Sequence, residues 1–220
     1  MSEQTHRSLF IPGPAGRLEA ILWTPAPEAP KPQFAAVVCH PHPLYSGTMH
    51  NKVVYHVNKT LDRLGLAVLR FNFRGVGRSE GAHDEGRGER EDVHAALDFL
   101  AAEFPGVPLL VAGFSFGCWV GLRVGCEDAR VAELISLGAP VDGSDFSYLR
   151  QCAKPKLFLQ GDHDQFGARA NLETLVRSLP GTNELVFIAD ADHFFTGKLE
   201  GLDAALAASL TSRHPNLAAI

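Results

Sequence analysis

Leu-Leu-Val-Ala-Gly-Phe-Ser-Phe-Gly-Cys-Trp, residues 109–119, is the stretch of this sequence that decides its fold. The apolar run before Gly113 predicts a strand, and the apolar segment after Gly117 is compatible with a helix. Ser115 therefore stands at the apex of a sharp strand-to-helix turn, flanked by the two glycines. This pattern is typical of a nucleophile elbow, which exposes a serine hydroxyl. The five-residue pattern also arises by chance, so its interpretation depends on the rest of the chain.

The composition restricts the class of protein. The 220 residues suffice for one α/β domain, and the 45% apolar and 20% charged residues are ordinary for a globular protein. The net charge of −5 and the lack of a Lys/Arg cluster argue against binding to nucleic acid or a membrane surface. Residues 1–7 are polar, and no apolar run is long enough to span a bilayer, so we expect a cytoplasmic protein. No feature specifies an oligomeric state.

The four cysteines do not have the spacing of a metal site. Cys39 and Cys118 lie in apolar runs, which predicts buried thiols. The pair His40-x-His42 has the spacing of some metal sites, but no matching His/Asp motif follows it. We therefore expect no metal and no cofactor.

Apolar runs alternate with helix-compatible segments from residue 34 onward, which predicts a mostly parallel sheet of about eight strands with helices on both faces. The first two strands are separated by a Pro/Gly turn and should form an antiparallel hairpin. The charged, Gly-rich segment 80–90 is expected to be an exposed loop. No composition shift divides the chain, so residues 1–220 are expected to form a single domain. The expected strands are 8–11, 17–24, 34–39, 66–71, 109–113, 131–137, 156–160 and 184–188, and the expected helices 49–64, 91–103, 116–125, 168–179 and 199–210.

A serine hydroxyl needs a base within hydrogen-bond reach, and that base needs an orienting acid. Gly161-Asp-His-Asp164 follows one predicted strand, and Asp190-Ala-Asp-His193 follows the next. The chain order Ser115, Asp164, His193 is that of the α/β-hydrolases. Asp162 is the alternative acid, with a second interpretation as a residue that shapes the turn.

The chain resembles the α/β-hydrolase superfamily from about residue 8 to residue 212. Gly161-x-x-Asp164 resembles the acid turn of that family, and Asp192-His193 resembles its histidine loop. Phe73-Arg-Gly-x-Gly-x-Ser79 is similar to a loop common in the superfamily. The run His40-Pro-His-Pro43 resembles a bacterial group of small, lidless serine hydrolases. Segment 140–152 stands where many members carry a cap and is too short to form one, so we expect none.

The resemblance implies an oxyanion hole formed by the N–H of Phe116 and one N–H from the loop after strand 34–39. Pro41 and Pro43 have no N–H. His42 is the donor at the matching position, and Leu44 is the alternative.

These assignments predict a serine hydrolase that cleaves a small-molecule acyl ester through Ser115, His193 and Asp164. Tyr45, Phe146 and Phe194 are candidate walls of the substrate site, although core packing explains aromatic residues equally well. A thioesterase, peptidase or acyltransferase on the same residues is an alternative, because the fold does not choose among them. The other class of function is that of a non-catalytic interaction protein with this fold.

Overall fold

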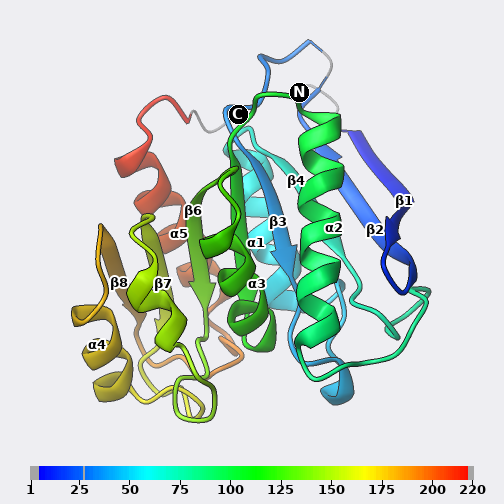
Figure 1. Cartoon of the computed structure of the whole chain (residues 1–220). Coiled ribbons are helices and arrows are strands. Elements are labelled where there is room, and N and C mark those ends of the chain that lie inside the picture. Colours follow the sequence, from blue (N-terminus) through cyan, green and yellow to red (C-terminus); the bar gives the residue numbers. More distant parts are fainter. Residues whose placement is uncertain (1–4, 27, 218–220) are drawn as a thin grey trace.

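The computed structural model describes residues 5–26 and 28–217, so the first four residues of the polar N-terminal segment lie outside it. One eight-stranded sheet runs through the molecule in the order β1-β2-β4-β3-β5-β6-β7-β8 (Figure 1). Strands β3 to β8 are parallel, whereas β2 pairs antiparallel with both β1 and β4. The eight predicted strands and the hairpin are thereby confirmed. The strands are β1 (Thr5–Gly13), β2 (Gly16–Thr24), β3 (Ala35–Cys39), β4 (Ala67–Phe71), β5 (Leu109–Phe114), β6 (Val131–Leu137), β7 (Lys156–Gly161) and β8 (Asn183–Ile188).

Helices cover both faces of the sheet, as predicted (Figure 1). In β3, Val37 and Cys39 belong to the core cluster beneath α2, α3 and α4, and Ala36 and Val38 belong to the cluster beneath α1 and α5. A strand buried on both faces is apolar at every position, which explains the continuous run at residues 35–39. The helices are α1 (Lys52–Arg63), α2 (Arg87–Glu103), α3 (Phe116–Glu127), α4 (Arg169–Arg177) and α5 (Leu199–Arg213).

Two helix starts differ from the prediction by more than one residue. Helix α1 begins at Lys52 because the Asn51 side chain accepts a hydrogen bond from the N–H of Val53, as an N-cap residue does. Helix α2 begins at Arg87, four residues earlier than expected, and Glu89 in its first turn is fully buried. The expectation of an exposed loop throughout 80–90 is therefore wrong for its last residues.

The connection from β6 to β7 contains only the short 3-10 turn η2 (Ser147–Gln151), so no cap domain covers the sheet, as expected. A second such turn, η1 (Pro43–Tyr45), follows β3. Within the described residues, no helix is both long enough and apolar enough to cross a membrane.

All four cysteines are free, and Cys39 and Cys118 are buried as predicted. Burial raises the pKa of the Cys118 thiol to about 12. These two thiols lie on facing elements, β3 and α3, within the main core cluster, and Cys118 Sγ also lies 2.8 Å from the hydroxyl of Ser136.

Candidate active site

Ser115 lies at the turn between β5 and α3, and close packing of backbone determines that turn. Its φ of 55° and ψ of −118° lie in a region that non-glycine residues rarely occupy. A Cβ at Gly117 would lie 2.4 Å from the carbonyl oxygen of Cys39, and a Cβ at Gly113 would lie 2.3 Å from the carbonyl oxygen of Gly117. Only glycine fits at either position, so the two glycines permit the strained turn that exposes the serine.

The structure brings Ser115, His193 and Asp164 together from three separate loops. His193 Nε2 lies 2.9 Å from Ser115 Oγ, and His193 Nδ1 lies 2.8 Å from Asp164 Oδ2. Both His193 and Asp164 are almost completely buried. The carboxylate accepts from Nδ1–H, which leaves the lone pair of Nε2 facing the serine hydroxyl.

Asp164 is held by further hydrogen bonds. Its Oδ1 accepts from the N–H groups of Phe166 and Gly167 at 2.8 and 3.2 Å. Its Oδ2 also accepts from Gln160 Nε2 at 2.8 Å, while Gln160 Oε1 accepts from the N–H of Ala139. Gln160 thus joins the acid to the loop after β6, a role that the sequence analysis missed. The available signal was a polar residue at the end of the apolar run of β7.

The acid turn and the histidine loop lie in close contact. A Cβ at Gly161 would lie 2.3 Å from the carbonyl oxygen of Ala191, so glycine is required for this approach. Asp192 Oδ1 accepts from the N–H groups of Phe194 and Thr196, and the latter bond lowers the pKa of this carboxyl most strongly. Asp162, the alternative acid, makes no hydrogen bond to His193, and its Oδ1 is buried without a partner.

His40 organises the opposite side of Ser115. The ring is fully buried, with Nδ1 2.6 Å from the carbonyl oxygen of Pro41 and Nε2 accepting from the N–H of Phe73 at 3.0 Å. Burial lowers the pKa of His40 to about 4, so the ring is neutral at pH 7. His40 therefore links the loop after β3 to the loop after β4, and both of its nitrogens are used within the protein.

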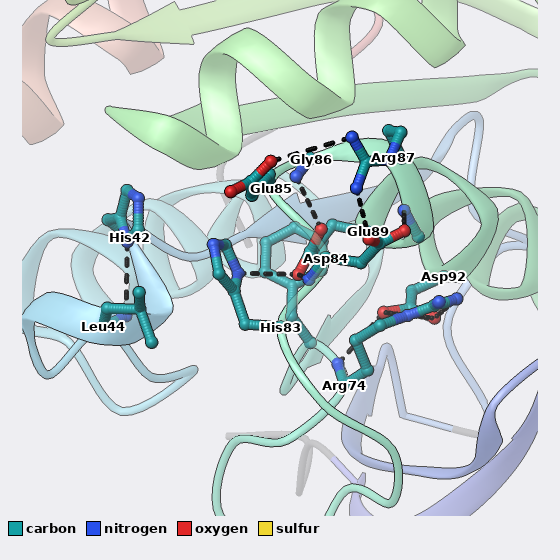
Figure 2. A network of polar contacts seen from close by, with 12 residues as sticks. His42, Leu44, Arg74, His83, Asp84, Glu85, Gly86, Arg87, Glu89 and Asp92 are labelled. Carbon is teal, nitrogen blue, oxygen red and sulfur yellow. Dashed lines mark hydrogen bonds and ion pairs between the residues drawn. The ribbon is translucent and has the colours of Figure 1, made fainter.

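The backbone N–H groups of His42 and Phe116 differ from that of Leu44 in whether they have a hydrogen-bond acceptor. The N–H of Leu44 donates to the Nδ1 of His42 at 3.2 Å (Figure 2). By contrast, the N–H groups of His42 and Phe116 have no acceptor among the described residues. Burial, and secondarily the neighbouring His83, lowers the pKa of the His42 ring, in keeping with a neutral Nδ1 that accepts. The side chains of the two residues touch, with ring centroids 4.7 Å apart.

Exposed apolar side chains surround this site. Leu44 and Tyr45 are 69% and 83% exposed and belong to η1. The rings of Phe166 and Phe194 lie 4.7 and 5.1 Å from the ring of His193 and are each nearly half exposed. We call Leu44, Tyr45, Phe166 and Phe194 the apolar rim.

Phe146 does not belong to the apolar rim. It is only 3% exposed, lies in the main core cluster and stacks on Tyr148 with 6.0 Å between ring centroids. Of the three aromatic residues predicted as walls, Tyr45 and Phe194 are thus the two at the surface beside the site.

A family model described as an alpha/beta hydrolase domain matches residues 36–212. The chain belongs to the α/β-hydrolase family. The uncharacterized protein RP471 of Rickettsia prowazekii is 38% identical to this hydrolase in an alignment 208 positions long, which covers 90% of this chain and 86% of that protein.

Two solved structures are similar along nearly their whole length. An α/β serine hydrolase homologue from Coxiella burnetii is 38% identical with a TM-score of 0.87, and the match covers 96% of this hydrolase and 98% of that chain. A serine hydrolase without a lid from Xanthomonas campestris is 36% identical with a TM-score of 0.86, and the match covers 97% and 95%. The predicted resemblance to small, lidless bacterial serine hydrolases is therefore confirmed.

Proposed function

We propose that this hydrolase cleaves small carboxylic esters through an acyl-enzyme on Ser115. The observation that carries the proposal is the hydrogen-bonded chain from Ser115 Oγ through His193 to the buried Asp164. A serine in this setting has the base and the orienting acid that nucleophilic catalysis requires. We keep the expectations of a cytoplasmic enzyme that needs no metal or cofactor.

In the first half-reaction, Ser115 Oγ attacks the ester carbonyl carbon while His193 Nε2 takes the hydroxyl proton. Asp164 holds the ring and stabilises the imidazolium that forms. The free N–H groups of Phe116 and His42 donate to the oxyanion of the tetrahedral intermediate. His193 then gives its proton to the leaving alcohol, and the acyl group stays on Ser115.

In the second half-reaction, His193 deprotonates a water molecule that attacks the acyl-enzyme. The same two N–H groups stabilise the second oxyanion, and the proton returns to Ser115 as the acid leaves. Leu44 is the weaker candidate for the second donor, because its N–H is already engaged by His42.

The apolar rim favours an ester with an apolar acyl or alcohol group. Four of the five large hydrophobic side chains that are well exposed among the described residues gather here, and Tyr45 and Phe194 are our proposed contacts. Because no cap covers the site, the bound group would remain partly open to water, which suits a small substrate.

The first test is labelling by a fluorophosphonate together with hydrolysis of p-nitrophenyl esters of increasing acyl length. We expect Ser115→Ala to abolish labelling and to lower kcat by about 10⁶-fold, as loss of the nucleophile does in serine proteases. Ser8→Ala, an exposed serine on β1, is the matched control and should behave as wild type. Persistent labelling of Ser115→Ala would overturn the assignment of the nucleophile.

The same assays separate the alternative functions. Matched thioester, peptide and acyl-acceptor substrates distinguish a thioesterase, a peptidase and an acyltransferase from an esterase. An interaction protein with an inactive site would leave the wild type unlabelled. A metal chelator should leave the activity unchanged, and clear inhibition would revive a metal site at His40-x-His42.

A further inference from the structure

The loop between β4 and α2 carries a histidine that the mechanism above does not use. His83 has only 13% of its side chain exposed, although it lies in a polar, Gly-rich stretch. Figure 2 shows its ring between His42 on one side and Glu89 on the other. A buried polar ring in this position needs a structural account.

The Glu89 carboxylate lies against one side of the His83 ring. The Glu89 carboxylate is fully buried and accepts from the N–H of Asp84 at 2.9 Å and from the N–H of Gly86 at 2.7 Å. His83 Nδ1 lies 2.7 Å from Glu89 Oε1. Among the described residues, His83 is the one Lys, Arg or His side chain with a nitrogen within 4 Å of the Glu89 carboxylate. Because the carboxylate is itself fixed by two backbone N–H groups, this close contact holds one side of the His83 ring in place.

The other side of the ring faces the proposed oxyanion hole. The centroid of His83 lies 5.1 Å from that of His42 and 5.7 Å from that of Phe116. Since the rings of His42 and Phe116 also touch, the three side chains form one cluster. Two of its members are the residues whose N–H groups we propose as the oxyanion donors.

The loop that carries His83 is anchored to α2 at a second point. Arg74 donates through Nη2 to Asp92 at 2.8 Å, and the N–H of Arg74 donates to the same carboxylate at 3.0 Å (Figure 2). Asp92 stands one helical turn beyond Glu89 and is also fully buried. Two buried carboxylates of one helix thus hold the two ends of the loop, which gives His83 a fixed position.

We propose that His83 is a positioning residue of the oxyanion hole: its ring, held by Glu89, packs against His42 and Phe116 and keeps their N–H groups aligned. This inference rests on the proposed function of Ser115. The donors of an oxyanion hole stabilise the transition state only when their geometry is set in advance. A shift of their supporting rings therefore lowers kcat and leaves KM nearly unchanged.

A purely structural role for the pair predicts a different result. Glu89 occupies the third position of α2 and accepts from the N–H of the N-cap residue Gly86, which is half of a capping box. If His83 only covered this cap, its ring would be dispensable for catalysis. A polar side chain without a ring would then suffice.

The variant His83→Asn separates the two roles, because it keeps a polar side chain beside Glu89 and removes the ring. We expect about a tenfold loss in kcat and in the rate constant of fluorophosphonate labelling, with KM changed by less than about twofold. This loss is smaller than the 10²–10³ caused by removal of a whole donor. The double variant His83→Phe/Glu89→Gln restores a ring without an unpaired carboxylate and should recover most of the lost kcat. His94→Gln, on the same helix, is the control.

Each outcome decides a separate point. A wild-type labelling rate for His83→Asn with only a lower Tm would overturn the positioning role. So would a fall in kcat that the double variant fails to rescue while its Tm is normal. A wild-type enzyme that is not labelled at all would instead refute the proposed function of Ser115, so the two failures remain distinguishable.

Discussion

The loops on the two sides of Ser115 are held in place by different forces. On the side of β7 and β8, polar side chains form a directional chain of hydrogen bonds from Gln160 through Asp164 to His193. On the side of β3 and β4, a buried neutral His40 and a cluster of packed rings fix the backbone. In the proposed mechanism, the first side determines where a proton can go, and the second determines where the backbone N–H donors point.

This difference predicts unequal sensitivity to mutation. A hydrogen-bonded chain fails when one member changes its donor or acceptor character, even if the shape is kept. A packed cluster tolerates a change of chemistry and responds to a change of shape. Three further experiments test this contrast, in order of decreasing effect.

Asp164→Asn should have the largest effect. The amide would donate to His193 Nδ1 and thereby favour the tautomer with a proton on Nε2, which cannot accept the proton of Ser115. In serine proteases, the equivalent change lowers kcat by about 10⁴-fold, and we expect a similar loss. Steady-state hydrolysis of the best p-nitrophenyl ester measures kcat, and a thermal melt by circular dichroism should change little.

Asp162→Asn is the matched control, since Asp162 is the other acid in the same turn. The Asp162 side chain makes no hydrogen bond to His193, so the kcat of this variant should stay within about twofold of wild type. A large loss for Asp162→Asn with an active Asp164→Asn would reverse the assignment of the acid.

His40, on the side of β3 and β4, should make the free energy of unfolding of the protein depend on pH. Burial lowers its pKa from 6.5 to about 4, so the unfolded chain binds the proton more readily than the native protein. The free energy of unfolding should therefore fall by about 3 kcal/mol as the pH drops from about 6.5 to about 4, with no further loss from this group below that range.

Urea unfolding of wild type and His40→Gln at pH 7, 5.5 and 4 measures this contribution. Burial also raises the pKa of Asp62 to about 6, which stabilises the native protein in acid, but this effect is common to both proteins and cancels in their difference. His50→Gln, an exposed histidine on the same loop, is the control. A pH-independent difference between wild type and His40→Gln would refute the account.

The sequence predicted most of the fold because the strands are buried on both faces and are apolar throughout. It missed the first turn of α2, where Arg-Gly-Glu-Arg has no apolar periodicity. That turn depends on distant contacts: a Cβ at Gly88 would lie 1.9 Å from Arg74 Nη1, and the Glu89 carboxylate holds the N-cap. Such contacts leave no local pattern for a sequence analysis to detect.

Some residues of the candidate site could be predicted from the sequence and others could not. Ser115, Asp164 and His193 lie in short motifs at strand ends, so their proximity follows from the topology of a parallel sheet. His83 is a single histidine in a charged loop, and only the folded chain brings it to His42 and Phe116. A series of hydrogen-bonded residues that lie in motifs at successive strand ends can be inferred from sequence. A cluster of rings from separate loops can be recognised only in the structure.

Gln160→Met should give the smallest effect and extends the contrast to a supporting residue. Methionine keeps the length of the side chain and removes the donor to Asp164 and the acceptor for the N–H of Ala139. We expect kcat to fall about tenfold and the free energy of unfolding to fall by about 1–3 kcal/mol, since a buried N–H loses its partner. Gln151→Met, an exposed glutamine in η2, should change neither quantity. An unchanged kcat with lowered stability would mean that Asp164 is oriented by the backbone N–H groups of Phe166 and Gly167 alone, and the polar chain would then begin at the acid.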